Sequence, residues 1–113
     1  MQRSQSPFEN VSPEQVKARL DAGEDFLFLD VREPEEYETA HIEGSELKPL
    51  STAQEWANDL PRDKPVVVFC HHGGRSANVA SALAQQLGYT NIANMTGGID
   101  AWAERIDPTV PRY

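Results

Sequence analysis

The sequence predicts an α/β domain with a mainly parallel β-sheet, and three observations support this. Two short apolar runs, 26–31 and 66–69, are bounded by charged residues or proline, as is typical of strands covered on both faces. Segments with helical periodicity or capping signals alternate with these runs. The length of 113 residues is that of one ordinary domain, so we expect a single domain over 1–113.

The N-terminal part predicts a frayed end over 1–6, followed by a helix. Ser12 is placed as the N-cap, Pro13 occupies the first helical position, and Gln15 can complete a capping box. We expect this helix to end at 22–23, and the strand 26–31 follows it.

Three further elements are predicted between the two apolar runs. The segment 34–39 is expected to form a short helix and 45–47 a brief edge strand. The segment 51–60 is expected to be a helix, with Ser51 as its N-cap and Gln54 closing a capping box.

The C-terminal part predicts a helix, a strand and a second helix. Five apolar residues recur at helical spacing before Gly88, namely Val79, Ala80, Leu83, Ala84 and Leu87. The segment 91–95 is a strand candidate. Glycines 97–98 then turn the chain into a short helix that carries Trp102. Strands that alternate with helices imply a parallel sheet with right-handed crossovers.

Charge and hydropathy argue against binding to nucleic acid or to membranes. The chain has 10 Lys and Arg against 18 Asp and Glu, a net charge of -8, which is the wrong sign for a phosphate backbone or an anionic bilayer. The longest apolar run, 66–70, is far shorter than a membrane span, and the N-terminus lacks an apolar signal segment. We therefore expect a soluble, cytoplasmic monomer.

The cysteine count limits the chemistry that the chain can support. Cys70 is the single cysteine, which excludes an intramolecular disulfide. With only His41, His71 and His72 besides, a structural zinc site would lack ligands, and we expect neither a metal nor an organic cofactor. The thiol of Cys70 is then either inert or reactive.

The segment 70–76 carries the strongest functional signal. An apolar strand ends at Cys70, and we expect a helix to begin at Ser76. In open α/β sheets ligands bind beyond the carboxyl ends of strands, and Gly73 and Gly74 permit backbone N–H groups to converge on the sulfur. The helix N-terminus and Arg75 favour the thiolate, so its pKa should fall below the free value of about 8.5. This pattern predicts a nucleophilic cysteine.

The same residues have simpler interpretations. Cys70 could be a small buried core residue, the two glycines a flexible turn, and Arg75 a solvated residue. The Gly-Gly-Arg-Ser continuation favours the nucleophile, because a core cysteine does not require it. A cation at a helix N-terminus is unfavourable, so Arg75 is expected to have an anionic partner.

The histidines and the first polar cluster carry weaker signals. His71 and His72 could transfer protons or donate hydrogen bonds at the loop rim, but solvated loop positions are favoured. His41 is interpreted as a turn residue without a catalytic role. Asp30 and Arg32 could pair in a surface network, and Asp30, at the end of a strand, could support the loop.

Four motifs in order resemble the rhodanese-like domains, over about residues 11–102. Asp-Val-Arg-Glu at 30–33 resembles the first family signature and His-Ile-Glu-Gly at 41–44 the second. Cys-His-His-Gly-Gly-Arg-Ser at 70–76 resembles the Cys-x-x-Gly-x-Arg active-site loop, and 97–102 completes the set. The resemblance implies a three-layer fold, with a mainly parallel sheet of about five strands and helices on both faces.

The resemblance also implies a sulfurtransferase. The Cys70 thiolate would attack the sulfane sulfur of a donor, thiosulfate or a persulfide, and the resulting Cys70 persulfide would pass the sulfur to a thiophilic acceptor. The partners would thus be a small-molecule or protein donor and a thiol acceptor. Asp30 and Arg32 would support the loop. The residues expected to bind the sulfur and the donor are His71, His72, Gly73, Gly74, Arg75 and Ser76.

Two other functions remain open from the sequence. Related cysteine phosphatases and arsenate reductases use a loop that is one residue longer, whereas Cys70 and Arg75 enclose four residues, a ring better suited to a single sulfur. A non-catalytic sulfur-carrier or interaction domain is the other alternative, against which the retained Cys70 argues.

Overall fold

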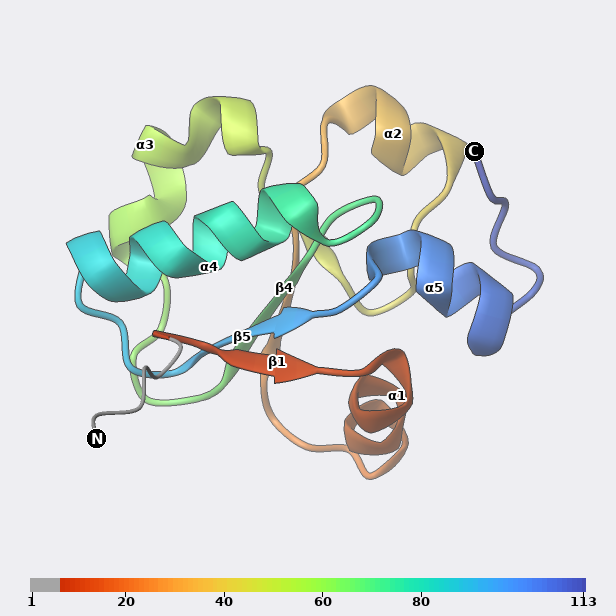
Figure 1. Ribbon diagram of the computed structural model, residues 1–113, viewed down its shortest axis with the longest axis horizontal. Helices are drawn as coiled ribbons and strands as arrows, with labels where there is room; N and C mark the ends of the chain where they lie inside the picture. Colours follow the sequence, from red (N-terminus) through yellow and green to blue (C-terminus); the bar gives the residue numbers. More distant parts are fainter. Residues whose placement is uncertain (1–6) are drawn as a thin grey trace, which may run out of the picture.

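A five-stranded parallel sheet forms the centre of the protein in the computed structural model, which describes residues 7–113 (Figure 1). The expected frayed end, 1–6, lies outside the described residues. The sheet order is β1-β5-β4-β2-β3, and every neighbouring pair is parallel. The strands are β1 (Glu9–Val11), β2 (Leu27–Asp30), β3 (Glu46–Leu47), β4 (Val66–Phe69) and β5 (Ile92–Met95).

Helices cover both faces of this sheet. They are α1 (Pro13–Asp21), α2 (Pro34–Thr39), α3 (Ala53–Trp56), α4 (Gly74–Gln86) and α5 (Gly98–Arg105), with 3₁₀ turns η1 (Leu50–Thr52) and η2 (Ala57–Asp59) on either side of α3. Figure 1 shows α1 on one side of the sheet and α3 and α4 on the other. The expected α/β fold with helices on both faces is confirmed.

The alternation of side chains along β4 divides the core into two clusters. Val67 and Phe69 pack with Trp102 of α5 on one face, whereas Val66 and Val68 pack with Leu83 of α4 on the other. All four β4 side chains are buried, as expected for the central strand of a parallel sheet. This two-sided burial holds the carboxyl end of β4 in a fixed position.

Local signals predicted several elements well. The Ser12 hydroxyl accepts a hydrogen bond from the N–H of Gln15, whose side chain accepts one from the N–H of Ser12, so the expected capping box is present. The helix over 34–39 has the predicted bounds. The brief strand near 45–47 lies at the sheet edge, as expected.

The predicted helix over 51–60 is confirmed only in part, because the α-helix covers Ala53–Trp56 alone and 3₁₀ turns form the rest of the segment on either side. Ser51 does not cap it. Instead the hydroxyl and N–H of Ser51 donate to the carboxylate of Glu33, at 2.6 and 3.2 Å. This tertiary partner replaces the local cap, and a hydrogen bond from the Trp56 indole to the carbonyl of Pro49 anchors the altered turn.

Two further differences concern the sheet and the loop that follows Cys70. Strand β1 was not predicted; its three residues form a strand because β5 supplies a parallel partner. Helix α4 begins at Gly74, two residues before the predicted start at Ser76, because Gly73 at φ 106° turns the chain directly into the helix. Within 7–113, no helix has both the length and the apolar character to cross a membrane.

Candidate active site

Cys70 lies directly after β4, at the carboxyl end of the central strand of the sheet. The residue is 1% exposed, and its sulfur faces the first turn of α4. The N–H of Gly73 lies 3.1 Å from the Sγ atom and the N–H of Ser76 lies 3.4 Å from it. The turn through Gly73 therefore directs backbone donors at the sulfur, as the sequence predicted.

These donors decide the acidity of the thiol. Burial raises the pKa of Cys70, but hydrogen bonds from the hydroxyl and N–H of Ser76, and from the N–H groups of Gly73 and His72, outweigh it and lower the pKa below its ordinary value. The thiolate is the form that these donors favour. A buried core cysteine would not have this arrangement, so the geometry supports a reactive thiol.

The N-terminus of α5 orients the loop from behind. The N–H of Ile99 donates to the carbonyl of Cys70 at 2.8 Å, and the N–H of Asp100 donates to the carbonyl of His71 at 3.0 Å. In a planar trans peptide the C=O and N–H point in opposite directions. Holding the His71 carbonyl against α5 therefore turns the N–H of His72 toward the sulfur.

Ser76 connects the sulfur to β5 through a buried side chain. Its hydroxyl lies 2.6 Å from Oδ1 of Asn94, to which it donates, and 3.2 Å from the carbonyl of Gly73. Both Ser76 and Asn94 are buried. A hydroxyl has one proton, so Asn94 competes with the Cys70 sulfur for it. Sequence reasoning missed Asn94, because this residue reaches the site only through β5 and has no local signal.

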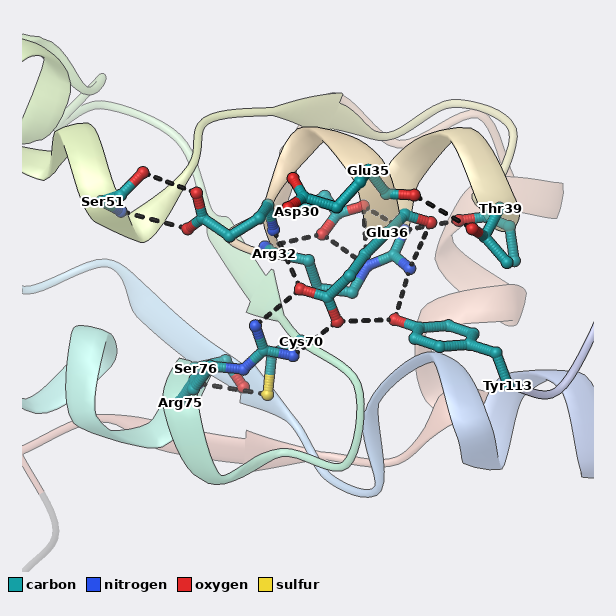
Figure 2. A network of polar contacts seen from close by, with 12 residues as sticks. Asp30, Arg32, Glu35, Glu36, Thr39, Ser51, Cys70, Arg75, Ser76 and Tyr113 are labelled. Atoms are coloured by element: carbon teal, nitrogen blue, oxygen red, sulfur yellow. Dashed lines mark hydrogen bonds and ion pairs between the residues drawn. The ribbon is translucent and has the colours of Figure 1, made fainter.

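Arg75 has an intramolecular anionic partner. Its two terminal nitrogens donate to the two carboxylate oxygens of Glu36 on α2, at 2.7 and 2.8 Å (Figure 2). The Arg75 hydrogen bonds, outweighing burial, lower the pKa of Glu36 to about 2. The expectation of an anionic partner for Arg75 is met within the chain. Sequence reasoning did not identify Glu36, which lies 39 positions away.

Asp30 and Arg32 form a buried pair, which differs from the expected surface network. Both side chains are 0% exposed, and Nη2 of Arg32 lies 2.6 Å from Oδ2 of Asp30. The same guanidinium donates to the carbonyls of Glu36 and Ala40 and to the Tyr113 hydroxyl. The pair thus fixes α2, the helix that presents Glu36 to Arg75. It is consistent with an indirect supporting role, in which the pair holds α2 and Glu36 holds the loop.

His71 and His72 lie in different environments. The ring of His71 is stacked between those of His72 and Tyr113, with both centroids 3.9 Å away, and its Nε2 atom is buried without a hydrogen-bond partner among the described residues. The favoured interpretation of a solvated position is wrong for His71, because the C-terminal residue folds over it. It holds for His72, whose side chain is 67% exposed. Burial, with the nearby His72, lowers the pKa of His71.

The other histidine and the metal-binding potential complete the site. His41 is exposed and stacks on Tyr37 at 4.5 Å, and it lies just before the turn at 43–44 rather than within it. Ligand atoms of His71, His72 and Asp100 lie within 4.8 Å of one another, and sequence reasoning missed this group. The Asp100 carboxylate already accepts two 3.0 Å hydrogen bonds from Arg112, which a metal ion would have to displace.

Comparisons with known proteins identify the family and the fold of this chain. The family model described as Rhodanese-like domain matches residues 12–105. Thiosulfate sulfurtransferase GlpE of Pseudoalteromonas translucida is 32% identical over 105 residues, which cover 93% of this chain and 98% of that protein. The crystal structure of a rhodanese-related protein from Thermoplasma volcanium is similar with a TM-score of 0.78 and 35% identity, and the match covers 94% of this chain and 100% of that one.

A longer relative shares the same region. The probable adenylyltransferase/sulfurtransferase MoeZ of Mycobacterium tuberculosis is 33% identical over 105 residues, which are 91% of this chain. This chain spans only 26% of the length of MoeZ. The similarity therefore concerns only part of that protein.

Proposed function

The chain belongs to the rhodanese-like domain family, and from this premise we propose that it is a sulfurtransferase that carries a sulfane sulfur as a persulfide on Cys70. The observation that carries the proposal is the convergence of the Gly73 and Ser76 N–H groups on Sγ, at 3.1 and 3.4 Å. Hydrogen-bond donors at these positions stabilise negative charge on sulfur before and after the transfer. The lowered pKa of Cys70 supplies the nucleophile.

In the first half-reaction, the Cys70 thiolate attacks the sulfane sulfur of the donor. A new S–S bond forms to Sγ, the S–S bond of the donor breaks, and the bonding electron pair leaves with the remainder of the donor. A persulfide donor R–S–SH yields Cys70–S–SH and the thiolate RS⁻. Charge is conserved, and neither an external oxidant nor a cofactor is required.

In the second half-reaction, an acceptor thiolate attacks the outer sulfur of the Cys70 persulfide. The acceptor becomes a persulfide, and Cys70 returns as a thiolate to the same N–H donors of the loop. The two half-reactions form a ping-pong cycle, because the first product leaves before the acceptor enters. The hydrogen bonds from α5 and from the Ser76 N–H already hold the loop around the sulfur before a donor binds, so we expect the cycle to need little reorganisation.

The test is intact-protein mass spectrometry after incubation with glutathione persulfide. We expect a gain of one sulfur atom that reducing agent removes, localised to the peptide that contains Cys70. Cys70→Ser, a nearly isosteric change, should fold and acquire no sulfur. Subsequent addition of a thiol acceptor should return the natural protein to its original mass. Absence of the added sulfur in the folded natural protein would contradict the proposal.

A further inference from the structure

We propose that Glu36 determines donor specificity, by holding Arg75 in a charge-neutral pair so that the site accepts persulfides in preference to thiosulfate. This inference rests on the proposed sulfurtransferase function and names its substrate class. It assigns a role to a residue outside the catalytic loop. The argument depends on the charge that an incoming donor meets around Cys70.

The Glu36 carboxylate offsets the positive charge of Arg75. Each carboxylate oxygen accepts one N–H of the guanidinium, a bidentate arrangement that is the strongest kind of carboxylate–arginine pair. Glu36 is itself fixed, because its oxygens also accept hydrogen bonds from the N–H of Glu33 and from the Tyr113 hydroxyl. The side chains of Glu36 and Arg75 are 20% and 38% exposed, so the pair lies at the rim of the site.

The other charged groups near the loop do not replace this cation. Arg32 is paired with Asp30 in the interior. Arg112, which reaches the loop through Asp100, pairs with that carboxylate and with Glu104. The lowered pKa of His71 keeps its ring neutral at pH 7. Each of these arginines therefore pairs with a carboxylate of a described residue. The chain as a whole has a net charge of -8.

Thiosulfate and persulfides differ in the charge that they bring to this site. Thiosulfate brings two negative charges to the Cys70 thiolate. Its S–S bond breaks as the sulfane sulfur bonds to Sγ, and the electron pair leaves with sulfite, which carries two charges, while the Cys70 persulfide keeps the third. A persulfide carries at most one charge on its sulfurs, and a protonated persulfide carries none. A site in which the cations are already paired stabilises neither the incoming thiosulfate dianion nor the sulfite dianion that forms. We therefore expect this chain to differ in donor preference from its relative that is named a thiosulfate sulfurtransferase.

The test compares three substitutions on α2. Glu36→Gln removes the charge but keeps an oxygen that can accept from Arg75. Glu36→Asp keeps the charge and shortens the side chain. Glu35→Gln removes the charge of the neighbouring residue, which is exposed and whose side chain makes no hydrogen bond or ion pair among the described residues, and so is a matched control. For each folded variant, kcat and KM are measured with thiosulfate and with glutathione persulfide.

We expect Glu36→Gln to raise the ratio of kcat/KM for thiosulfate to kcat/KM for the persulfide by about five- to tenfold at low ionic strength, chiefly through the KM for thiosulfate. The gain should shrink at high salt, because salt screens the released charge of Arg75. Glu36→Asp and Glu35→Gln should keep the natural ratio. An unchanged ratio in Glu36→Gln, or an equal rise in Glu35→Gln or in Glu36→Asp, would overturn the proposal.

A measurement on the unmodified protein keeps the proposal testable if Glu36→Gln does not fold. Because Glu36 offsets the charge of Arg75, the negative charge of the protein repels thiosulfate. The kcat/KM for thiosulfate should therefore rise as salt is added. A free steering arginine would make kcat/KM fall with salt, which would contradict the role of Glu36. Failure of the sulfurtransferase function itself is distinct, because Cys70 would then acquire no sulfur from either donor.

Discussion

Gly98 packs directly against the carbonyl oxygen of Cys70. At φ 60° its backbone adopts the left-handed conformation, and a Cβ atom at this position would overlap the carbonyl oxygens of Cys70 and His71. This close approach permits the next two N–H groups of α5 to bind those carbonyls. The glycine thus determines the orientation of the loop that follows Cys70, although it lies far from Cys70 in the sequence.

Gly98→Ala is expected to lower the free energy of unfolding by about 2–4 kcal/mol, of which about 1 kcal/mol is left-handed strain and the rest steric overlap. Gly23→Ala is the matched control, since Gly23 has φ 70° and nothing within 4 Å of its Cβ position. It should lose only about 1 kcal/mol. Urea denaturation measures both. Equal losses of unfolding free energy in the two variants would show that the contact between Gly98 and the loop does not contribute to stability.

Cys70 is expected to react with iodoacetamide faster than a free thiol near neutral pH. The hydrogen bonds from Ser76, Gly73 and His72 outweigh burial and lower the pKa of the thiol, so the pH–rate profile should have its inflection below the free value of about 8.5. Free glutathione under the same conditions is the reference. An inflection at or above that of glutathione would refute thiolate activation.

Ser76→Ala is expected to raise the pKa of Cys70, because a hydroxyl donor to the thiolate is lost while the backbone N–H remains. The same pH–rate profile measures the shift. Ser81→Ala, on the same helix α4 and bonded only to the Gln85 side chain, should leave the pKa unchanged. An unchanged or lower pKa in Ser76→Ala would mean that Asn94 takes the hydroxyl proton entirely.

Phosphatase activity on aryl phosphates is expected to be negligible. The loop encloses four residues between Cys70 and Arg75, and its N–H groups converge on one sulfur rather than surrounding a tetrahedral oxyanion. Insertion of one glycine between Gly73 and Gly74 should weaken sulfur transfer and widen the ring of donors. Efficient hydrolysis of p-nitrophenyl phosphate by the unmodified protein would contradict the argument from loop length.

The Glu36–Arg75 pair also predicts how stability depends on pH. The pKa of Glu36 is lowered from 4.5 to about 2, so its contribution is fully present above pH 4.5 and is lost as the pH falls toward 2. After discounting for the partial exposure of Arg75, that contribution is about 1–2 kcal/mol. Glu36→Gln should therefore lose less stability than the natural protein between pH 4.5 and 2.

Chemical denaturation at several pH values in this range tests the acid dependence. Part of the natural acid sensitivity should persist in Glu36→Gln, because Glu14, paired with Arg105, also has its pKa lowered to about 2. Glu35→Gln should retain the full natural dependence. If the stability of Glu36→Gln and that of the natural protein fell in parallel with pH, the Glu36–Arg75 pair would not contribute to the acid dependence of stability.

The sequence by itself was sufficient where the signals are local. The capping box of Ser12 and Gln15 and the bounds of α2 depend on residues within a few positions of one another. The four apolar residues of β4 identify a strand buried on both faces. The turn after Cys70 could be predicted because glycines permit the backbone conformation that directs N–H groups at the sulfur.

The tertiary structure decided the partners of these elements. Arg75 could be solvated or paired on local grounds, and only the packing of α2 beside the loop selects Glu36. Likewise β1 becomes a strand because β5 lies next to it. Ser51 binds Glu33 instead of capping a helix, and Tyr113 covers His71. Such pairs form only when the chain is folded, because contacts between distant residues depend on how whole elements pack and leave no short-range pattern in the sequence.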